Sequence, residues 1–258
     1  MEQKTKKSRL DEFIEAPNQA LWKLSLPMML GMAVQAVFMM ADTAFVGRMI
    51  GGIALASLGY VFPYLFIIMG ITFGLGSGAT TVIAQYIGEK NKKDADSAAG
   101  HTILLGIIIG IIIITIGYCF GDKLLKIQGA NDETIIIALD YFYIMAGGSI
   151  FMVMSVFFRS ILSGEGEVVF PMKILGLGTI INLILDPILI YYYQISGAAL
   201  ATIISQIIVM FIFIYYMIIR QNTYLTFSIR TFNYNSTILY KILQLGIPAS
   251  LSMIIMSM

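Results

Sequence analysis

No charged side chain occurs between residues 49 and 88. A helix needs only ~20 mostly apolar residues to cross a bilayer, so this stretch is long enough to span a membrane. The rest of the chain is similar, with 58% hydrophobic residues, 12% charged residues and a mean hydropathy of +0.86. Soluble domains carry about 25% charged residues. The sequence therefore predicts an all-α polytopic membrane protein.

Six apolar segments of membrane-spanning length follow one another, separated by polar or glycine-containing loops. They predict a cytosolic N-terminal segment at residues 1–20, a six-helix transmembrane lobe at 21–219 and a cytosolic linker at 220–240. The predicted helices are about Leu24–Arg48, Ala56–Ala84, Ser97–Phe120, Thr134–Leu162, Lys173–Tyr193 and Gly197–Ile219.

Glycines and turn residues refine this outline. Gly147 and Gly148 are expected to interrupt the fourth helix, and Gln194–Ser196 to form the turn between the fifth and sixth. In the second helix a neighbour can approach closely along one face, because glycines recur there every four residues, at Gly70, Gly74 and Gly78.

The positions of Lys and Arg predict the orientation. Of the 16 basic residues only Arg48, Lys123 and Lys126 fall on one side, which leaves 13 on the other. Positive residues beside spanning segments stay in the cytosol. We therefore expect a multi-pass protein of the plasma (cytoplasmic) membrane with a cytosolic N-terminus.

The chain then begins a second time. Leu24–Pro27, with the sequence LSLP, is echoed by Leu245–Pro248, with the sequence LGIP. A restart after six crossings is what a tandem six-helix repeat predicts. Residues 241–258 are expected to begin a second lobe, with too few residues beyond Pro248 to cross the membrane. The chain is then either a fragment of a longer protein or a half-length transporter that forms a homodimer.

Two carboxylates stand inside predicted spans, Asp42 in the first and Asp186 in the fifth. An intramembrane carboxylate is costly unless it is paired, hydrated or protonated, so it indicates function. Asn182 lies on the same helical face as Asp186, and Pro187 frees a backbone carbonyl one turn earlier. Thr202 is expected at a matching depth in the sixth helix. These oxygen donors predict a site for a proton or a sodium ion.

Other interpretations of the same residues remain open. Asp42 could mark a helix end, Asp186–Pro187 could be a break between short helices, Asn182 could bond a neighbouring helix, and Thr202 could bond its own helix. Weaker candidates for a substrate cavity are Gln35, Met39, Ser155 and Gln206. Arg159 with Glu165 or Glu167 is expected to form an interfacial charge cluster.

Several functions are excluded. His101 and Cys119 are the only residues of their types, so a histidine metal centre, a Ser-His-Asp triad and an intrachain disulfide have too few residues. No HExxH or GxSxG motif with a partner histidine occurs. The net charge of +1 does not favour nucleic acid. We therefore expect no enzyme, no cofactor and no nucleic-acid partner.

The motifs LSLPMMLG, ADTAFVGR, IGEKNKKDADSAAG, SGEG, NLILDPILI, GAALAT and LGIPASL, in this order, resemble the bacterial multidrug and toxic compound extrusion (MATE) transporters. The resemblance covers residues from about Leu21 to Met258. It implies two six-helix lobes in a twelve-helix protein, facing each other across a cavity. It also implies export of cationic or amphipathic drugs and toxins in exchange for protons or sodium ions.

The motifs allow the functional positions of the family to be assigned to residues of this chain. The resemblance implies a coupling-ion site at Asp42, Asn182, Asp186 and Thr202, which is also the candidate Na⁺ site, and helix bending at Pro27. We expect Pro187 to be a second hinge. The chain departs from the family pattern at Ser155 and Val156, where many relatives carry an Asn pair, and at Ser163, where they carry Arg. The runner-up function is a lipid-linked oligosaccharide flippase of the same superfamily. An inactive half-length fragment is a further alternative.

Overall fold

The computed structural model describes residues 17–129, 131–220, 222–226 and 233–257. Within these ranges the protein is helical and contains no strand, which confirms the predicted fold class. The helices are α2 (Pro17–Met49), α3 (Gly52–Gly88), α4 (Lys92–Ile127), α5 (Asp132–Gly164), α6 (Val169–Ile214) and α7 (Ser236–Ser257), with a π-helical turn, η1 (Tyr215–Ile219), after α6.

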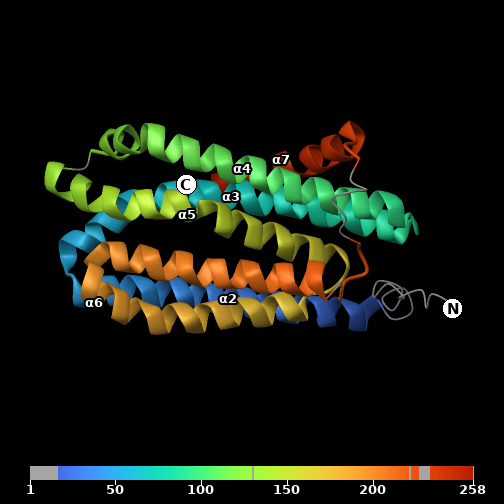
Figure 1. The fold of residues 1–258 in the computed structure, drawn as a ribbon, viewed down its shortest axis with the longest axis horizontal. Helices are drawn as coiled ribbons and strands as arrows, with labels where there is room; N and C mark the ends of the chain where they lie inside the picture. Colours follow the sequence, from blue (N-terminus) through green and yellow to red (C-terminus); the bar gives the residue numbers. More distant parts are fainter. Residues whose placement is uncertain (1–16, 130, 221, 227–232, 258) are drawn as a thin grey trace.

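All six of these helices are long and apolar enough to cross a membrane. α6 contains two of the predicted crossings, because the chain reverses direction at Gln194, where φ is 53° and ψ is −134°. Gly197 follows the reversal, and a Cβ atom there would lie 2.1 Å from the carbonyl oxygen of Leu189. The turn predicted at Gln194–Ser196 is therefore present, and Figure 1 shows the two arms of α6 lying side by side.

The helices extend beyond their predicted ends, since hydropathy marks only the apolar part of a helix. α2 already begins at Pro17, and α4 takes in most of the charged loop before residue 97. Asn91 caps α4, because its Oδ1 accepts a hydrogen bond from Asp94 N at 3.2 Å.

One further expectation was wrong. α5 continues through Gly147 and Gly148 without a break, because closely packed neighbours such as Ile203, which lies against Gly148, support the helix there. The last helix, α7, begins earlier than predicted, at Ser236, and its 22 residues are long and apolar enough to cross a membrane. Its first turns lie in the stretch predicted as linker.

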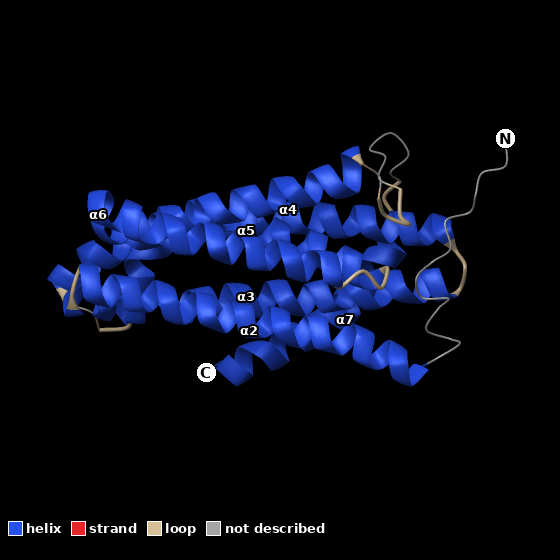
Figure 2. Ribbon diagram, turned by 90° about the horizontal axis from the view of Figure 1, so that it is seen from below, coloured by secondary structure: helices blue, strands red, loops and turns tan. Residues whose placement is uncertain are grey.

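The helices form two groups joined by α5. α3 packs against α4, α5 and α7, and α2 packs mainly against α6, while α5 contacts α3, α4 and α6. Figures 1 and 2 show the helices running along a common long axis. We call the end that holds residues 89–91, 165–168 and 222–226 the linker end, and the end that holds residues 50–51, 128–129 and 194 the hairpin end.

The glycine face of α3 receives α7. Cβ atoms added at Gly70, Gly74 and Gly78 would meet atoms of α7 at 2.8 Å or less. Ser250 of α7 also donates a hydrogen bond to the carbonyl oxygen of Ile71 at 3.0 Å. The expected close approach of a neighbour is therefore confirmed, and the neighbour is the first helix after the linker.

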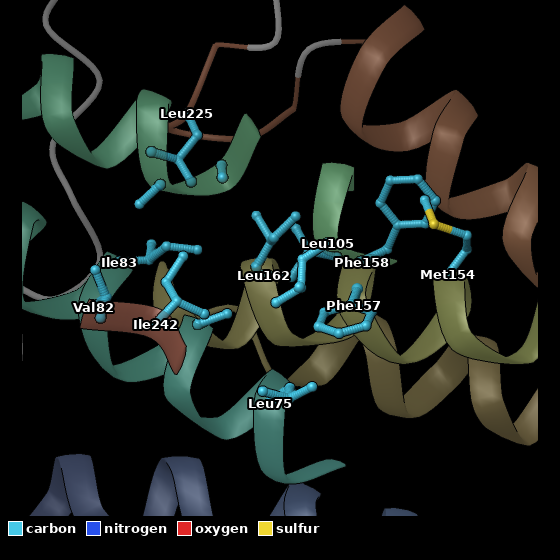
Figure 3. Packing of buried hydrophobic residues seen from close by; sticks show 14 of the residues in the cluster. Leu75, Val82, Ile83, Leu105, Met154, Phe157, Phe158, Leu162, Leu225 and Ile242 are labelled. Carbon is cyan, nitrogen blue, oxygen red and sulfur yellow. The ribbon is translucent and has the colours of Figure 1, made fainter. Parts of the chain in front are cut away.

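The core near the linker end contains residues from α3, α4, α5 and α7. Figure 3 shows Val82 and Ile83 of α3 and Leu162 of α5 near Ile242 of α7. The same cluster contains Leu225 from the linker, which is only 1% exposed. Leu225 thus connects the linker to the packed core at this end of the molecule.

Candidate functional site

Four polar side chains lie at a similar depth below the hairpin end. Asp42 lies seven residues before the end of α2, and Tyr141 lies nine residues after the start of α5. Asp186 and Thr202 lie eight residues before and eight residues after the reversal at Gln194. At about 1.5 Å per residue these positions lie roughly 10–14 Å from the hairpin end.

Asn182 joins Asp186 to Thr202. All three side chains are buried, with exposed fractions between 0% and 4%. In one orientation of the amide, Asn182 Nδ2 donates to Asp186 Oδ1 and to Thr202 Oγ1, each at 3.4 Å. In the reversed orientation Nδ2 donates to Asp186 Oδ2 at 3.0 Å, and Oδ1 accepts from Thr202 N at 3.2 Å. The shorter bonds favour the reversed orientation.

Asp42 faces this group from α2. Its side chain is 5% exposed, and its Oδ1 is buried without a hydrogen-bond partner among the described residues. Asp42 and Asp186 are close enough to interact electrostatically. A buried carboxylate oxygen without a donor is rare in folded proteins, so the site is suited to a proton or a cation.

Asp42 lines a partly open pocket between α2, α3, α5 and α6. Thr43, Tyr141 and Thr202 add polar groups to its wall. The remaining lining is apolar and rich in aromatic and methionine side chains: Phe38, Met39, Phe62, Leu65, Phe66, Met69, Met145 and Met152. Such a wall suits flat or flexible apolar compounds, because methionine side chains adapt their shape.

Tyr141 was not predicted as a site residue. It is 2% exposed, lines the pocket and lies within electrostatic range of both Asp42 and Asp186. In the sequence it follows Asp140 in an apolar helix that contains two more aromatic residues nearby, so it resembles a core residue. Its place seven to nine residues inside a helix end, like the two carboxylates, is the signal that could have found it.

The weaker candidates for a substrate cavity differ in whether they line the pocket. Met39 lines the pocket, whereas the side chain of Gln35 lies outside the described residues. Ser155 donates to the carbonyl oxygen of Phe151 at 2.8 Å within its own helix. Ser155 and the half-buried Gln206 are not among the lining residues of this pocket.

The competing structural interpretations can now be compared with the geometry. Asp42 lies inside α2 rather than at its end, and α6 continues through Pro187, so there is no break at Asp186–Pro187. α2 also continues through Pro27. Asn182 and Thr202 bond each other across the two arms of α6. The two prolines as hinges remain a prediction.

The expected cluster of Arg159 with Glu165 or Glu167 has a different arrangement. The Arg159 guanidinium lies over the Phe73 ring, 4.9 Å from its centroid. Glu165 accepts hydrogen bonds from the backbone N–H groups of Tyr224 and Leu225, each at 3.0 Å. Glu165 therefore holds the linker, because buried backbone donors require acceptors.

The donor set fits a monovalent ion better than a multivalent metal centre. In the described part of the chain, no group of three or more His, Cys, Asp or Glu residues gathers. Carboxylate, amide and hydroxyl oxygens from Asp42, Asp186, Asn182 and Thr202 are the hard ligands that Na⁺ would need. A proton could instead bind either carboxylate.

The comparisons with known proteins identify the family of the chain. The MatE family model matches residues 27–188. The chain is 29% identical over 242 residues to the probable multidrug resistance protein YoeA of Bacillus subtilis, which covers 90% of this chain and 52% of YoeA. It is 28% identical over 240 residues to the multidrug export protein MepA of Staphylococcus aureus, which covers 92% of this chain and 53% of MepA.

Solved structures give the same result. A MOP superfamily transporter from Pyrococcus furiosus superposes with a TM-score of 0.89 at 34% identity, covering 93% of this chain and 54% of that one. The outward-facing conformation of a multidrug resistance MATE family transporter gives a TM-score of 0.90 with the same identity and coverage. The chain thus spans about half the length of the relatives that it matches. The family model covers more than half of the chain, so the protein belongs to the MatE family of membrane transporters, which are not enzymes.

Proposed function

We propose that this chain forms the first lobe of a secondary active efflux transporter. The transporter exports cationic or amphipathic compounds in exchange for protons or sodium ions. Its family and the names of its relatives support multidrug export. Because the chain spans about half of those relatives, a second lobe in the same longer chain, or a second copy of this chain, completes the transport pathway.

The observation that carries the proposal is the buried Asp42 carboxylate, whose Oδ1 has no partner beside an apolar pocket. A charge held there is costly, and binding of a proton or sodium ion removes most of that cost. Asp186 raises this energetic cost, because two nearby carboxylates repel each other until a bound cation or proton reduces their negative charge.

Ion binding then biases the shape of the site. The carboxylates come from α2 and α6, which pack against each other, so neutralising them changes the interaction between these helices. An ion can shift a conformational equilibrium only by binding one state more tightly than the other. A cationic compound in the pocket competes for the same negative charge, which couples export to ion entry. Bending at Pro27 and Pro187 is the expected structural response.

The orientation is part of the proposal. With the N-terminus in the cytosol, the linker end faces the cytosol and the hairpin end faces outward. The coupling site then lies in the outer half of the bilayer. Labelling of single cysteines introduced at the exposed Lys93 and Gln194 positions tests this orientation: in intact cells a membrane-impermeant thiol reagent should reach only position 194.

Transport by the complete protein in proteoliposomes tests the coupling. Asp42→Asn and Asp186→Asn should each lower uphill export at least about tenfold at normal expression, because the neutral amide cannot exchange an ion. Asp140→Asn is the matched control, since Asp140 is exposed on α5 next to Tyr141. Imposed pH and sodium gradients identify the ion. Uphill export by both Asn variants would show that the assignment is wrong.

A further inference from the structure

Arg159 is a half-buried cation without a polar partner. Its guanidinium lies 4.9 Å from the centroid of the Phe73 ring. Within the described ranges it makes no hydrogen bond and no ion pair. The ring satisfies one face of the guanidinium, while five N–H groups around its edge remain able to donate. This arrangement leaves a binding edge for an anion.

The helical positions of both residues continue the wall of the pocket. On α3 the lining residues Phe62, Phe66 and Met69 are followed at helical spacing by Phe73. On α5 the lining residue Met152 is followed two turns later by Arg159. At about 1.5 Å per residue, Arg159 lies roughly 10 Å beyond Met152 toward the linker end.

The two ends of the wall therefore carry side chains of opposite charge. The carboxylates of Asp42 and Asp186 lie near the hairpin end, and the cation of Arg159 lies on the linker side of the aromatic wall. A cationic ligand is attracted to the first site and repelled by the second. A carboxylate ligand has the opposite preference, and a planar guanidinium binds carboxylate through two parallel hydrogen bonds.

We propose that Arg159 and Phe73 form an anion subsite for amphipathic substrates that carry a carboxylate. The substrate's carboxylate accepts hydrogen bonds from Arg159, and its aromatic body packs on Phe73, Met69 and Phe66. The inference rests on the proposed efflux function and deepens it: among the compounds that the transporter exports, Arg159 determines the preference for those that carry a carboxylate. Arg159 thereby determines specificity, while the two carboxylates provide coupling.

The test uses rhodamine B, which carries a free carboxylate, and its ethyl ester, which does not. Uphill export of both dyes is measured in proteoliposomes with the complete protein. Arg159→Gln should lower kcat/KM for rhodamine B about tenfold or more and change that for the ester by less than about threefold, because charge-assisted hydrogen bonds contribute on this scale. Arg159→Lys should give an intermediate value, since Lys keeps the charge and loses the planar fork.

Lys93→Gln is the matched control, because Lys93 is an exposed cation near the linker end and away from the wall. It should leave both dyes unchanged. Equal loss for both dyes in Arg159→Gln would overturn the proposal in favour of a structural role. No loss for either dye, or failure of the native protein to export rhodamine B while exporting the ester, would also overturn it. Failure of the efflux function itself is recognised separately, because the native protein then exports neither dye. Ester export that survives both Asp42→Asn and Asp186→Asn would instead show that the coupling assignment is wrong.

Discussion

Tyr141 is the residue whose role was added by the structure alone. Its side chain lines the same pocket as Asp42 and lies within electrostatic range of both carboxylates. A hydroxyl in such a place can donate a hydrogen bond to a carboxylate and so favour its charged form. We infer that it tunes the exchange of the coupling ion without binding the ion by itself.

Tyr141→Phe should therefore lower coupled export several-fold while the protein still folds, since the ring fills the same space. Tyr143→Phe is the control, because Tyr143 stacks on Tyr118 with ring centroids 5.4 Å apart and does not line the pocket. Export rate against ion gradient, measured for both variants, checks the prediction. Equal rates in Tyr141→Phe and the native protein would remove Tyr141 from the site.

Gln194 has a backbone conformation that favours glycine, with φ of 53° and ψ of −134°. Residues held in such regions cost about 1–3 kcal/mol. Gln194→Gly should therefore raise the free energy of unfolding by about 1 kcal/mol, after the entropy cost of glycine is subtracted. Thermal unfolding in detergent measures this change.

Gly197→Ala provides the opposite case in the same turn. Its new Cβ would lie 2.1 Å from the Leu189 carbonyl oxygen, so the unfolding temperature should fall. If Gln194→Gly also lowers that temperature, the turn does not store the strain that its angles indicate.

At the scale of helices, the packing of α7 on α3 depends on missing side chains. A Cβ at Gly74 would lie 2.2 Å from the backbone nitrogen of Ser250, so Gly74→Leu should push the two helices apart. A protein with cysteines in place of Ile71 and Ser250 and serine at Cys119 should then lose most of its disulfide cross-linking. Gly59→Leu on the same helix is the control, since nothing lies within 4 Å of its Cβ position. Full cross-linking in Gly74→Leu would contradict the packing.

The linker is a second element held by specific contacts. Besides Glu165, Asp96 accepts a hydrogen bond from Thr226 N at 2.9 Å, and the buried His101 accepts one from Asn235 N through its Nε2 at 2.9 Å. Glu165→Ala removes both acceptors for Tyr224 and Leu225, and hydrogen exchange at these two amides should become at least about tenfold faster. Glu89→Ala, at an exposed residue near the same end, should leave it unchanged.

These elements also show how far the sequence could predict the structure. The length of the apolar segments predicted the crossings, and the short break between two of them predicted the turn at Gln194. The four-residue spacing of glycines predicted the close approach of a neighbouring helix. All three patterns depend on local composition and spacing. The structure brings Asn182, Asp186 and Thr202 together with Asp42, as their matching depths predicted. The continuity of α5 at Gly147 and the linker contacts of Glu165 were not predictable from local patterns, because they depend on partners distant in the sequence. The cap of α4 by Asn91 is a local contact, which hydropathy does not detect.

At the scale of the whole molecule, α2 makes few contacts apart from those with α6. Only 12% of the residues in its most apolar stretch are buried, and Met32 and Met40 are each more than 70% exposed. A membrane protein exposes such residues to lipid or to a second lobe at little cost, because the bilayer solvates them. The high apolar content of the sequence predicted this exposure in general, but not which helix would carry most of it.

The position of α7 has a practical consequence for dividing the protein. Sequence repetition suggests cutting between the halves somewhere in residues 220–240. Such a cut would leave the backbone groove along Gly70, Gly74 and Gly78 uncovered, and a cut before residue 225 would also remove Leu225 from the core. An independently produced first half should therefore retain α7 through Ser257. The boundary that the repeated sequence motif predicts and the boundary between parts that can be produced separately then fall at different places in the chain.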